Sequence, residues 1–230
     1  MPYKKSQSRK DFEESTKSLI SVTKKISFKS SSLTYEQKQL IYQSAIFLMS
    51  PKMEAYSKSL IESIIYNYKS RGATTDELPD NIINRTIIHN QLSHYRNFIN
   101  SSDEKKLLES ISYKNSYYKM LDDNHVACDF IHASPILSTN KYPSIKNMKI
   151  LYFRIGIKDI IKSIQSKGKK DYKDQLESFL SVREAIAHQE GPPLTFVDIE
   201  RHLNNLLEII NNVDRVVYSH ITKISGEKFW

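Results

Sequence analysis

The chain has 230 residues, of which 39% are apolar and 26% are charged. This length and composition are typical of a globular protein with one sizeable core and exclude a disordered or fibrous chain. No apolar run approaches the roughly 18 residues that a membrane-spanning helix needs, and charged residues rather than an apolar signal core follow the basic N-terminus. A single cysteine, Cys128, excludes an intramolecular disulfide, so we expect a cytoplasmic protein that does not associate with membranes.

The net charge is +8, which is compatible with a nucleic-acid partner. Only 8 of the 34 basic residues are arginines, and lysines scattered over helix faces are commonly just solvated surface. Both interpretations stay open, because only clustering of the basic residues in space would separate them.

Apolar residues at helical spacing predict helices along nearly the whole chain. The first helix carries the stripe Phe12, Leu19, Val22 and Ile26. Thr34 and Gln37 form a capping-box pattern that opens an apolar-rich segment over residues 35–68. We expect Pro51 to kink or divide this segment and Gly72 to end it.

Pro79-Asp80 begins a further helix, whose expected stripe is Ile83, Ile87, Tyr95 and Phe98. Another helix is predicted from about residue 103, with the stripe Leu107, Leu108, Ile111, Tyr118 and Leu121. Between residues 125 and 144 the helical period is lost. We interpret this stretch as an irregular insertion that has room for a short hairpin and is a candidate for function.

Helices resume at Ile145, with Gly156 ending one short helix and residues 159–165 forming another before a loop over 166–170. Residues 171–188 form a strongly amphipathic helix that Gly191-Pro192-Pro193 ends. A second capping box opens the last helix. It consists of Thr195 and Asp198, and the helix carries the stripe Ile199, Leu203, Leu206, Ile210, Val213, Val217 and Ile224. The sequence therefore predicts an all-α, mostly antiparallel helical bundle.

Arg183 and His188 form an Arg-x4-His pair, which suits RNA cleavage chemically. A histidine moves protons near neutral pH, and a guanidinium can hold two phosphate oxygens. The spacing alone means little, because chance supplies about 0.7 such pairs in this composition, and Arg215 and His220 repeat it. Only His188 stands at the end of a predicted helix, where a cationic side chain is favoured.

The segment from Phe179 to Gly191 resembles the Arg-x4–6-His signature of the HEPN superfamily, in particular its RiboL-PSP-type branch. Residues 45–56, ending in Glu54-Ala-Tyr56, resemble the apolar helix of that branch that ends in Ala-Leu-Glu-x-Tyr. Residues 150–160 resemble its Leu-Gly-Ile segment, and residues 195–221 its closing helix. The pieces occur in the expected order over residues 35–221.

Two residues depart from the branch's pattern: Glu184 follows the arginine where members often carry Asn, Asp or His, and Gln189 follows the histidine where a glycine is common. The glutamate could pair with Arg183 instead of supporting catalysis. Both departures put catalytic competence in question while they leave the fold untouched.

The resemblance implies one HEPN-like domain over residues 1–230, with an N-terminal helix and linker over 1–34 and a core bundle over 35–224. It implies a metal-independent endoribonuclease without a cofactor, in which two protomers bring both Arg–His pairs into one cleft. The 2′-hydroxyl of RNA attacks the adjacent phosphate there and leaves a 2′,3′-cyclic phosphate. His188 would transfer protons, Arg183 would stabilise the phosphate charge and Glu184 would take a supporting position.

Such proteins are commonly toxins or antiviral effectors, so an RNA substrate, a second copy of the chain and an antitoxin or defence partner are the expected partners. The alternative is a catalytically inactive HEPN module that dimerises or binds RNA within a larger complex. A helical DNA-binding protein is supported by charge alone, since no basic helix with base-reading side chains is found.

Three further groups of residues have weaker functional interpretations. The stretch from Asp122 to His132 contains residue types found in zinc sites, but it lacks a Cys-x2-Cys pair, and we expect a polar loop without metal. A second group on the helix after Pro79 could add a phosphate-binding surface or simply be exposed: Arg85, His89, His94 and Arg96. Glu54 is an unusual carboxylate on an apolar helix, where a structural pairing and a place in the active cleft both stay open.

Overall fold

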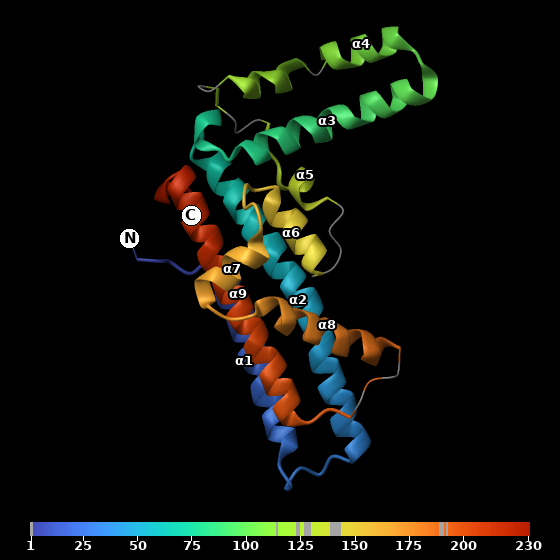
Figure 1. Cartoon of the computed structure of the whole chain (residues 1–230), viewed down its shortest axis with the longest axis vertical. Helices are drawn as coiled ribbons and strands as arrows, with labels where there is room; N and C mark the ends of the chain where they lie inside the picture. The colour runs from blue at the N-terminus through green and yellow to red at the C-terminus, as the bar shows by residue number, and fades with distance from the viewer. Residues whose placement is uncertain are drawn as a thin grey trace. The chain divides into compact units, whose positions relative to one another are not determined.

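The computed structural model describes residues 2–113, 115–122, 125–126, 130–138, 144–188, 191 and 193–230. Over these ranges the chain forms nine α-helices and three short 3₁₀ helices, η1 (Thr75–Glu77), η2 (Asn115–Leu121) and η3 (Glu227–Phe229). The only extended pairing within them is an isolated bridge between Thr74 and Val126. The predicted all-α fold is therefore confirmed (Figure 1).

The helices belong to two compact units. The first comprises residues 1–60, 141–149 and 159–218, and the second residues 61–140, 150–158 and 219–230. Two long helices, α2 (Tyr35–Ser70) and α9 (Phe196–Ile224), contribute residues to both. The single domain over residues 1–230 stays a prediction.

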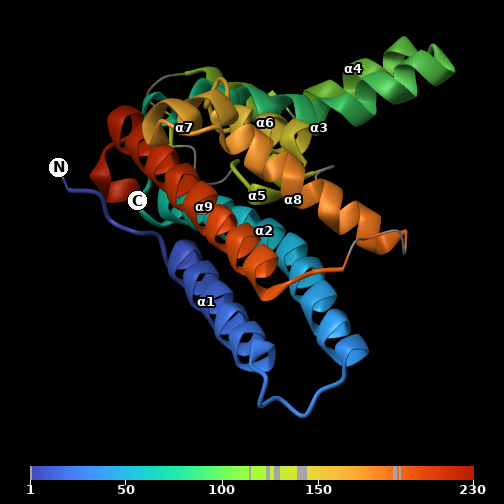
Figure 2. The ribbon, with the colours of Figure 1, turned by 60° about the horizontal axis from the view of Figure 1, so that its bottom comes forward.

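The first unit consists mainly of α1 (Gln7–Ser27), α7 (Ile160–Gly168), α8 (Tyr172–Ala187) and the larger parts of α2 and α9. Helices α1 and α2 run antiparallel, with Ser8 donating to Ser59 at 3.0 Å near one end and Thr16 contacting Met49 further along. Both views of the ribbon show α9 alongside α1 (Figures 1 and 2). This packing gives each amphipathic helix a neighbour on its apolar side.

Helix α9 supplies the largest share of the core of the first unit. Six of its buried positions are ones that the sequence predicts, each no more than 1% exposed: Ile199, Leu203, Leu206, Ile210, Val213 and Val217. The last member of the predicted stripe, Ile224, is 44% exposed.

The predicted stripe of α1 is wrong in part. Val22 is 47% exposed, whereas Thr16 and Thr23 are buried, as is the predicted Phe12. The two threonine hydroxyls donate to helix carbonyls, Thr16 to Phe12 O at 2.7 Å and Thr23 to Leu19 O at 2.8 Å. Because their polar atoms are satisfied within the helix, threonines can occupy buried positions that an apolar pattern does not reveal.

Both predicted capping boxes form. Thr34 N–H donates to Gln37 Oε1 at 2.9 Å and Gln37 N–H to Thr34 Oγ1 at 3.3 Å, while Thr195 and Asp198 exchange bonds of 3.0 and 3.3 Å. The possible division of α2 at Pro51 does not occur, since the helix is continuous over 36 residues. A proline removes one helix hydrogen bond, and packing of a helix in a core can offset that loss.

Helix α7 extends further than the sequence predicts. It runs to Gly168, with Asp159 as its N-cap and Lys169 as a left-handed C-cap (φ +54°), so most of the expected loop over 166–170 is helical. Gly156 follows α6 (Ile145–Phe153) at φ +96°, as the predicted helix stop requires.

The second unit contains an antiparallel pair, α3 (Asp80–Ser101) and α4 (Glu104–Tyr113), joined through Ser102 in the left-handed conformation (Figure 1). The helix predicted from about residue 103 is confirmed as α4, but its expected extension through Tyr118 and Leu121 is wrong, because α4 ends at Tyr113 and η2 follows. No residue of α4 is buried, and Leu121 is 65% exposed. The apolar period of this region therefore does not mark a core-facing helix.

The predicted irregular insertion contains a short helix, α5 (Ala133–Leu137), instead of a hairpin in its described part. Two arginines bind the end of α5: Arg85 donates to Pro135 O at 2.9 Å and Arg154 to Ile136 O at 2.6 Å. Residues 127–129, which include Cys128, and residues 139–143 lie outside the described residues.

The end of α9 and η3 pack against the last turns of α2 within the second unit. Tyr68 Oη lies 2.7 Å from Ser225 Oγ, and the rings of Tyr68 and Phe229 are 5.0 Å apart. Along the described ranges, no helix is apolar over enough length to cross a membrane.

Candidate active site at the end of helix α8

Helix α8 is held in place by one buried face. Asp171 caps its first turn by accepting from Asp174 N–H at 3.2 Å, and its buried face consists of Tyr172, Leu176, Phe179 and Ile186. His188 is the C-cap residue, and its N–H donates to Glu184 O at 3.1 Å. The opposite face of the last two turns is therefore left for other contacts.

The chain turns back closely after α8. A Cβ at Gly191 would lie 3.1 Å from Ile186 Cγ1, so a larger residue fits poorly at this position. Further on, Gln39 of α2 binds the backbone of Leu194 twice, as donor to its carbonyl and acceptor from its N–H, both at 2.8 Å. These two bonds tie the backbone just before α9 to α2.

All three predicted site residues line one pocket of about 400 Å³ in the first unit. The arginine is half-buried, while the glutamate and the histidine are exposed: Arg183, Glu184 and His188. The remaining lining comes from Leu180 and Ala187 of α8, from Ser50 of α2 and from Ser144. The structure thus places the residues with the guanidinium, the carboxylate and the imidazole, Arg183, Glu184 and His188, at one solvent-accessible pocket.

The arginine of this pocket is oriented by an aromatic ring of α2. Arg183 Cζ lies 5.8 Å from the ring centroid of Phe47, within the range of a cation–π contact. Glu184 is not among the residues that form ion pairs in the described part of the chain. Glu184 therefore lines the pocket without an ion-pair partner among the described residues.

Two serines of the pocket were not predicted from the sequence. Ser144 caps α6, since its Oγ accepts from Asn147 N–H at 3.1 Å. Ser50 is 2% exposed, and its hydroxyl has no hydrogen-bond partner within the described chain. Ser50 stands directly before Pro51, whose missing N–H interrupts the helix hydrogen bonding at this turn.

The second Arg-x4-His pair has a different setting. Arg215 donates to Asn211 Oδ1 at 3.2 Å and stacks over Tyr3 at 4.9 Å. His220 Nε2 lies 3.0 Å from Ile155 O, and burial lowers the pKa of this imidazole. Both residues lie inside the continuous helix α9, and each side chain has its own separate contacts.

The other candidate groups do not converge on this pocket. Arg85 is bound to α5, and Glu54 is half-buried but not part of the pocket lining. Of the metal-type cluster, Asp123, Cys128 and Asp129 lie outside the described residues, and the described ones form no group of three ligands. Burial lowers the pKa of His132.

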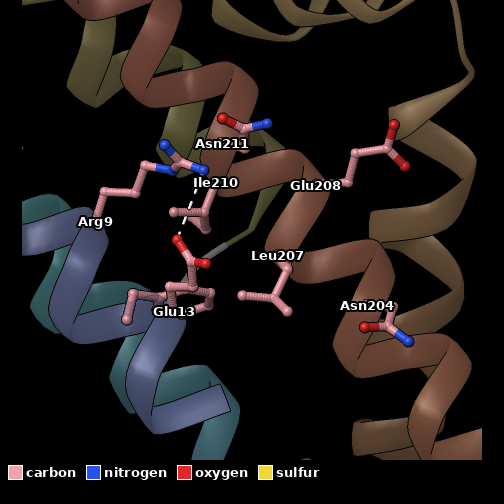
Figure 3. Close-up of a pocket in the computed structure, with 8 residues that line it drawn as sticks. Arg9, Glu13, Asn204, Leu207, Glu208, Ile210 and Asn211 are labelled. Carbon is pink, nitrogen blue, oxygen red and sulfur yellow. Dashed lines mark ion pairs between the residues drawn. The ribbon is translucent and has the colours of Figure 1, made fainter. Parts of the chain in front are cut away.

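A second pocket of about 240 Å³ lies between α1 and α9 (Figure 3). Its central charge is Glu13, which pairs with Lys17 at 2.6 Å, Lys5 at 3.2 Å and Arg9 at 3.7 Å. Hydrogen bonds from Lys17 and Lys5 lower the pKa of Glu13 to about 2. Because its charge is neutralised by neighbouring cations, this pocket has the character of a surface ion-pair network.

A comparison with protein families identifies the chain. The family model described as RiboL-PSP-HEPN matches residues 10–219 and so includes every described residue of the α8 pocket. No curated protein and no solved structure matches the chain. HEPN domains include ribonucleases and RNA-binding modules, which defines the broad class of function. With the match covering most of its length, the chain belongs to the RiboL-PSP-HEPN family.

Proposed function

We propose that this protein is a metal-independent endoribonuclease and that the α8 pocket is its active site. The observation that carries the proposal is the shared lining of one pocket by Arg183 and His188, with His188 exposed. Of the two Arg-x4-His pairs, this is the one whose histidine is accessible at a helix end.

The proposed reaction needs proton transfer and charge stabilisation. The ribose 2′-hydroxyl loses its proton and its oxygen forms a bond to phosphorus, while the bond from phosphorus to the 5′-oxygen breaks. The 5′-oxygen takes up a proton, and the products are a 2′,3′-cyclic phosphate and a 5′-hydroxyl. His188 transfers protons and Arg183 stabilises the negative charge that builds on the phosphate oxygens.

The reaction requires a base near the 2′-oxygen and an acid near the 5′-oxygen, whereas the described pocket contains one histidine. A homodimer that joins two pockets would supply both, so we propose a second copy and an RNA substrate as partners. An activity of this kind suits a cytoplasmic toxin or an antiviral effector, which an antitoxin or defence protein would restrain.

The test is RNA cleavage by the purified chain in the presence of EDTA, with analysis of the product ends. We expect cyclic-phosphate ends from the unmodified chain and a loss of cleavage of at least about a hundredfold for Arg183→Ala and for His188→Ala. Arg215→Ala, which changes the arginine of the second Arg-x4-His pair, is the matched control. Cleavage that persists unchanged in the Arg183 and His188 variants would overturn the proposal.

A second candidate function is favoured by Glu184. Its carboxylate lines the pocket beside Arg183, and a negative charge there opposes the approach of a phosphate. An inactive HEPN module that dimerises and binds RNA within a larger complex would tolerate such a residue. It predicts a stable dimer that binds RNA, without cleavage and without toxicity on expression.

A further inference from the structure

The floor of the α8 pocket contains a buried hydroxyl that the proposed function does not yet use. Ser50 lies on α2, is 2% exposed and lines the same pocket as Arg183 and His188. Its Oγ has no hydrogen-bond partner within the described chain. Burying a hydroxyl without a partner costs free energy, so such groups are rare in folded proteins and call for an explanation.

Three hydroxyls on α2 and on its neighbour α1 are satisfied within their own helix. Ser44 donates to Leu40 O at 2.7 Å, and Thr16 and Thr23 also donate to carbonyls four residues earlier. This is the usual arrangement for a serine or threonine inside a helix. Ser50 departs from it, and it is the member of this group that lines the pocket.

The turn of α2 that contains Ser50 also orients the arginine of the site. Pro51 lacks an N–H, so the carbonyl of Phe47 loses its helical donor, and the Phe47 ring contacts the Arg183 guanidinium. One turn of α2 therefore holds a ring that places the cation and a hydroxyl at the pocket floor.

We propose that the Ser50 hydroxyl is a substrate-binding group that donates a hydrogen bond to a non-bridging oxygen of the RNA phosphate bound by Arg183. This inference rests on the proposed function, because it assigns a phosphate to the pocket. A neutral donor at this position strengthens its bond as negative charge builds on the phosphate, and it takes no part in proton transfer. The occupied pocket would satisfy the hydroxyl that the protein leaves unpartnered.

The test combines cleavage, nucleotide binding and unfolding for Ser50→Ala, with Ser44→Ala on the exposed side of α2 as the matched control. We expect Ser50→Ala to lower kcat/KM by at least about tenfold, since a hydrogen bond to a charged group is lost. The affinity for uridine 3′-monophosphate, used as a non-cleavable probe, should fall by about the same factor. The Ser44→Ala values should equal those of the unmodified chain.

The unfolding temperature distinguishes a substrate-binding role of Ser50 from a structural one. If Ser50 had a structural role, Ser50→Ala would lower this temperature. Because the hydroxyl has no partner to lose, Ser50→Ala should unfold at the same temperature as the unmodified chain or at a higher one. Ser50→Cys retains most of the side-chain volume with a weak donor, and it should show the same loss of affinity as the alanine variant.

The outcomes separate the two proposals. If the unmodified chain cleaves RNA but Ser50→Ala keeps its kcat/KM and nucleotide affinity, the role of Ser50 is overturned and the ribonuclease stands. If the chain cleaves nothing, a weaker nucleotide affinity in Ser50→Ala still supports the phosphate contact, and an unchanged or undetectable affinity overturns it. A lower unfolding temperature that accounts for the lost binding would also overturn it.

Discussion

A buried carboxylate in α9 should be the most costly single polar side chain to remove from the first unit. Asp214 is 0% exposed. It accepts hydrogen bonds from Tyr3 Oη at 2.5 Å, from the Ser6 N–H at 3.2 Å and from Tyr56 Oη at 3.1 Å, and a further one from the Ser6 hydroxyl. Burial and this carboxylate raise the pKa of Tyr3. The network joins the N-terminal segment and α2 to α9.

The magnitude follows from what Asp214→Ala would leave behind. Hydrogen bonds to charged groups contribute about 1.5–3 kcal/mol each, but bonds that share one acceptor are not additive. Removing one partner of a buried charged network typically costs about 3–5 kcal/mol. We therefore expect a loss of about 3–5 kcal/mol in the free energy of unfolding, or about 6–20 °C in Tm for a chain of this size.

Urea denaturation followed by far-UV circular dichroism measures this loss. The matched control is Asp11→Ala, an exposed aspartate of α1 that accepts one bond from Gln7 at 2.7 Å and should change stability by less than about 0.5 kcal/mol. A loss below about 1 kcal/mol for Asp214→Ala, with an unchanged denaturant slope, would refute the reasoning.

Three further predictions concern the site and the core. Glu184→Gln should strengthen RNA binding by about two- to tenfold at low salt and less at high salt, as measured by fluorescence anisotropy; weaker binding would show that the carboxylate assists. Burial lowers the pKa of His202, so the unfolded chain binds its proton more tightly, and stability should fall as pH drops below about 6.5. His202→Gln should reduce that slope in denaturation experiments, and an unchanged slope would contradict this cause. Gly156→Ala should lower Tm more than Gly226→Ala. Both glycines lie near φ +95°, but only at Gly156 would an added Cβ lie 2.7 Å from His220 Nε2. Equal losses of Tm would show that the backbone conformation alone matters.

Local signals in the sequence predicted most helix boundaries correctly. Capping boxes at Thr34 and Thr195 and the stop at Gly156 depend on residues within a few positions of each other, so they can be read without a fold. The errors occurred where burial depends on distant segments. Helix α4 has an apolar period but buries no residue, and Val22 of α1 faces outward while Thr16 faces inward.

In the candidate site, too, some residues could be predicted from the sequence and others could not. Arg183, Glu184 and His188 lie within two turns of one helix, so the sequence could propose them as one group from the motif and from the helix end at residue 188, although the helical period alone does not place them on one face. Ser50 and Phe47 could not be associated with them, because no periodicity relates positions on two helices that are far apart in the sequence.

The sequence by itself determined the all-α class, the amphipathic core face of α9, the end of α8 and the Arg183–His188 pair. Each depends on short-range hydrogen bonding or on the helical period, which neighbouring residues specify. Only the tertiary structure decided which faces are buried, that Arg183 lies against Phe47, and that a buried serine forms the floor of the pocket. Those features depend on how whole helices pack, which many side chains determine together.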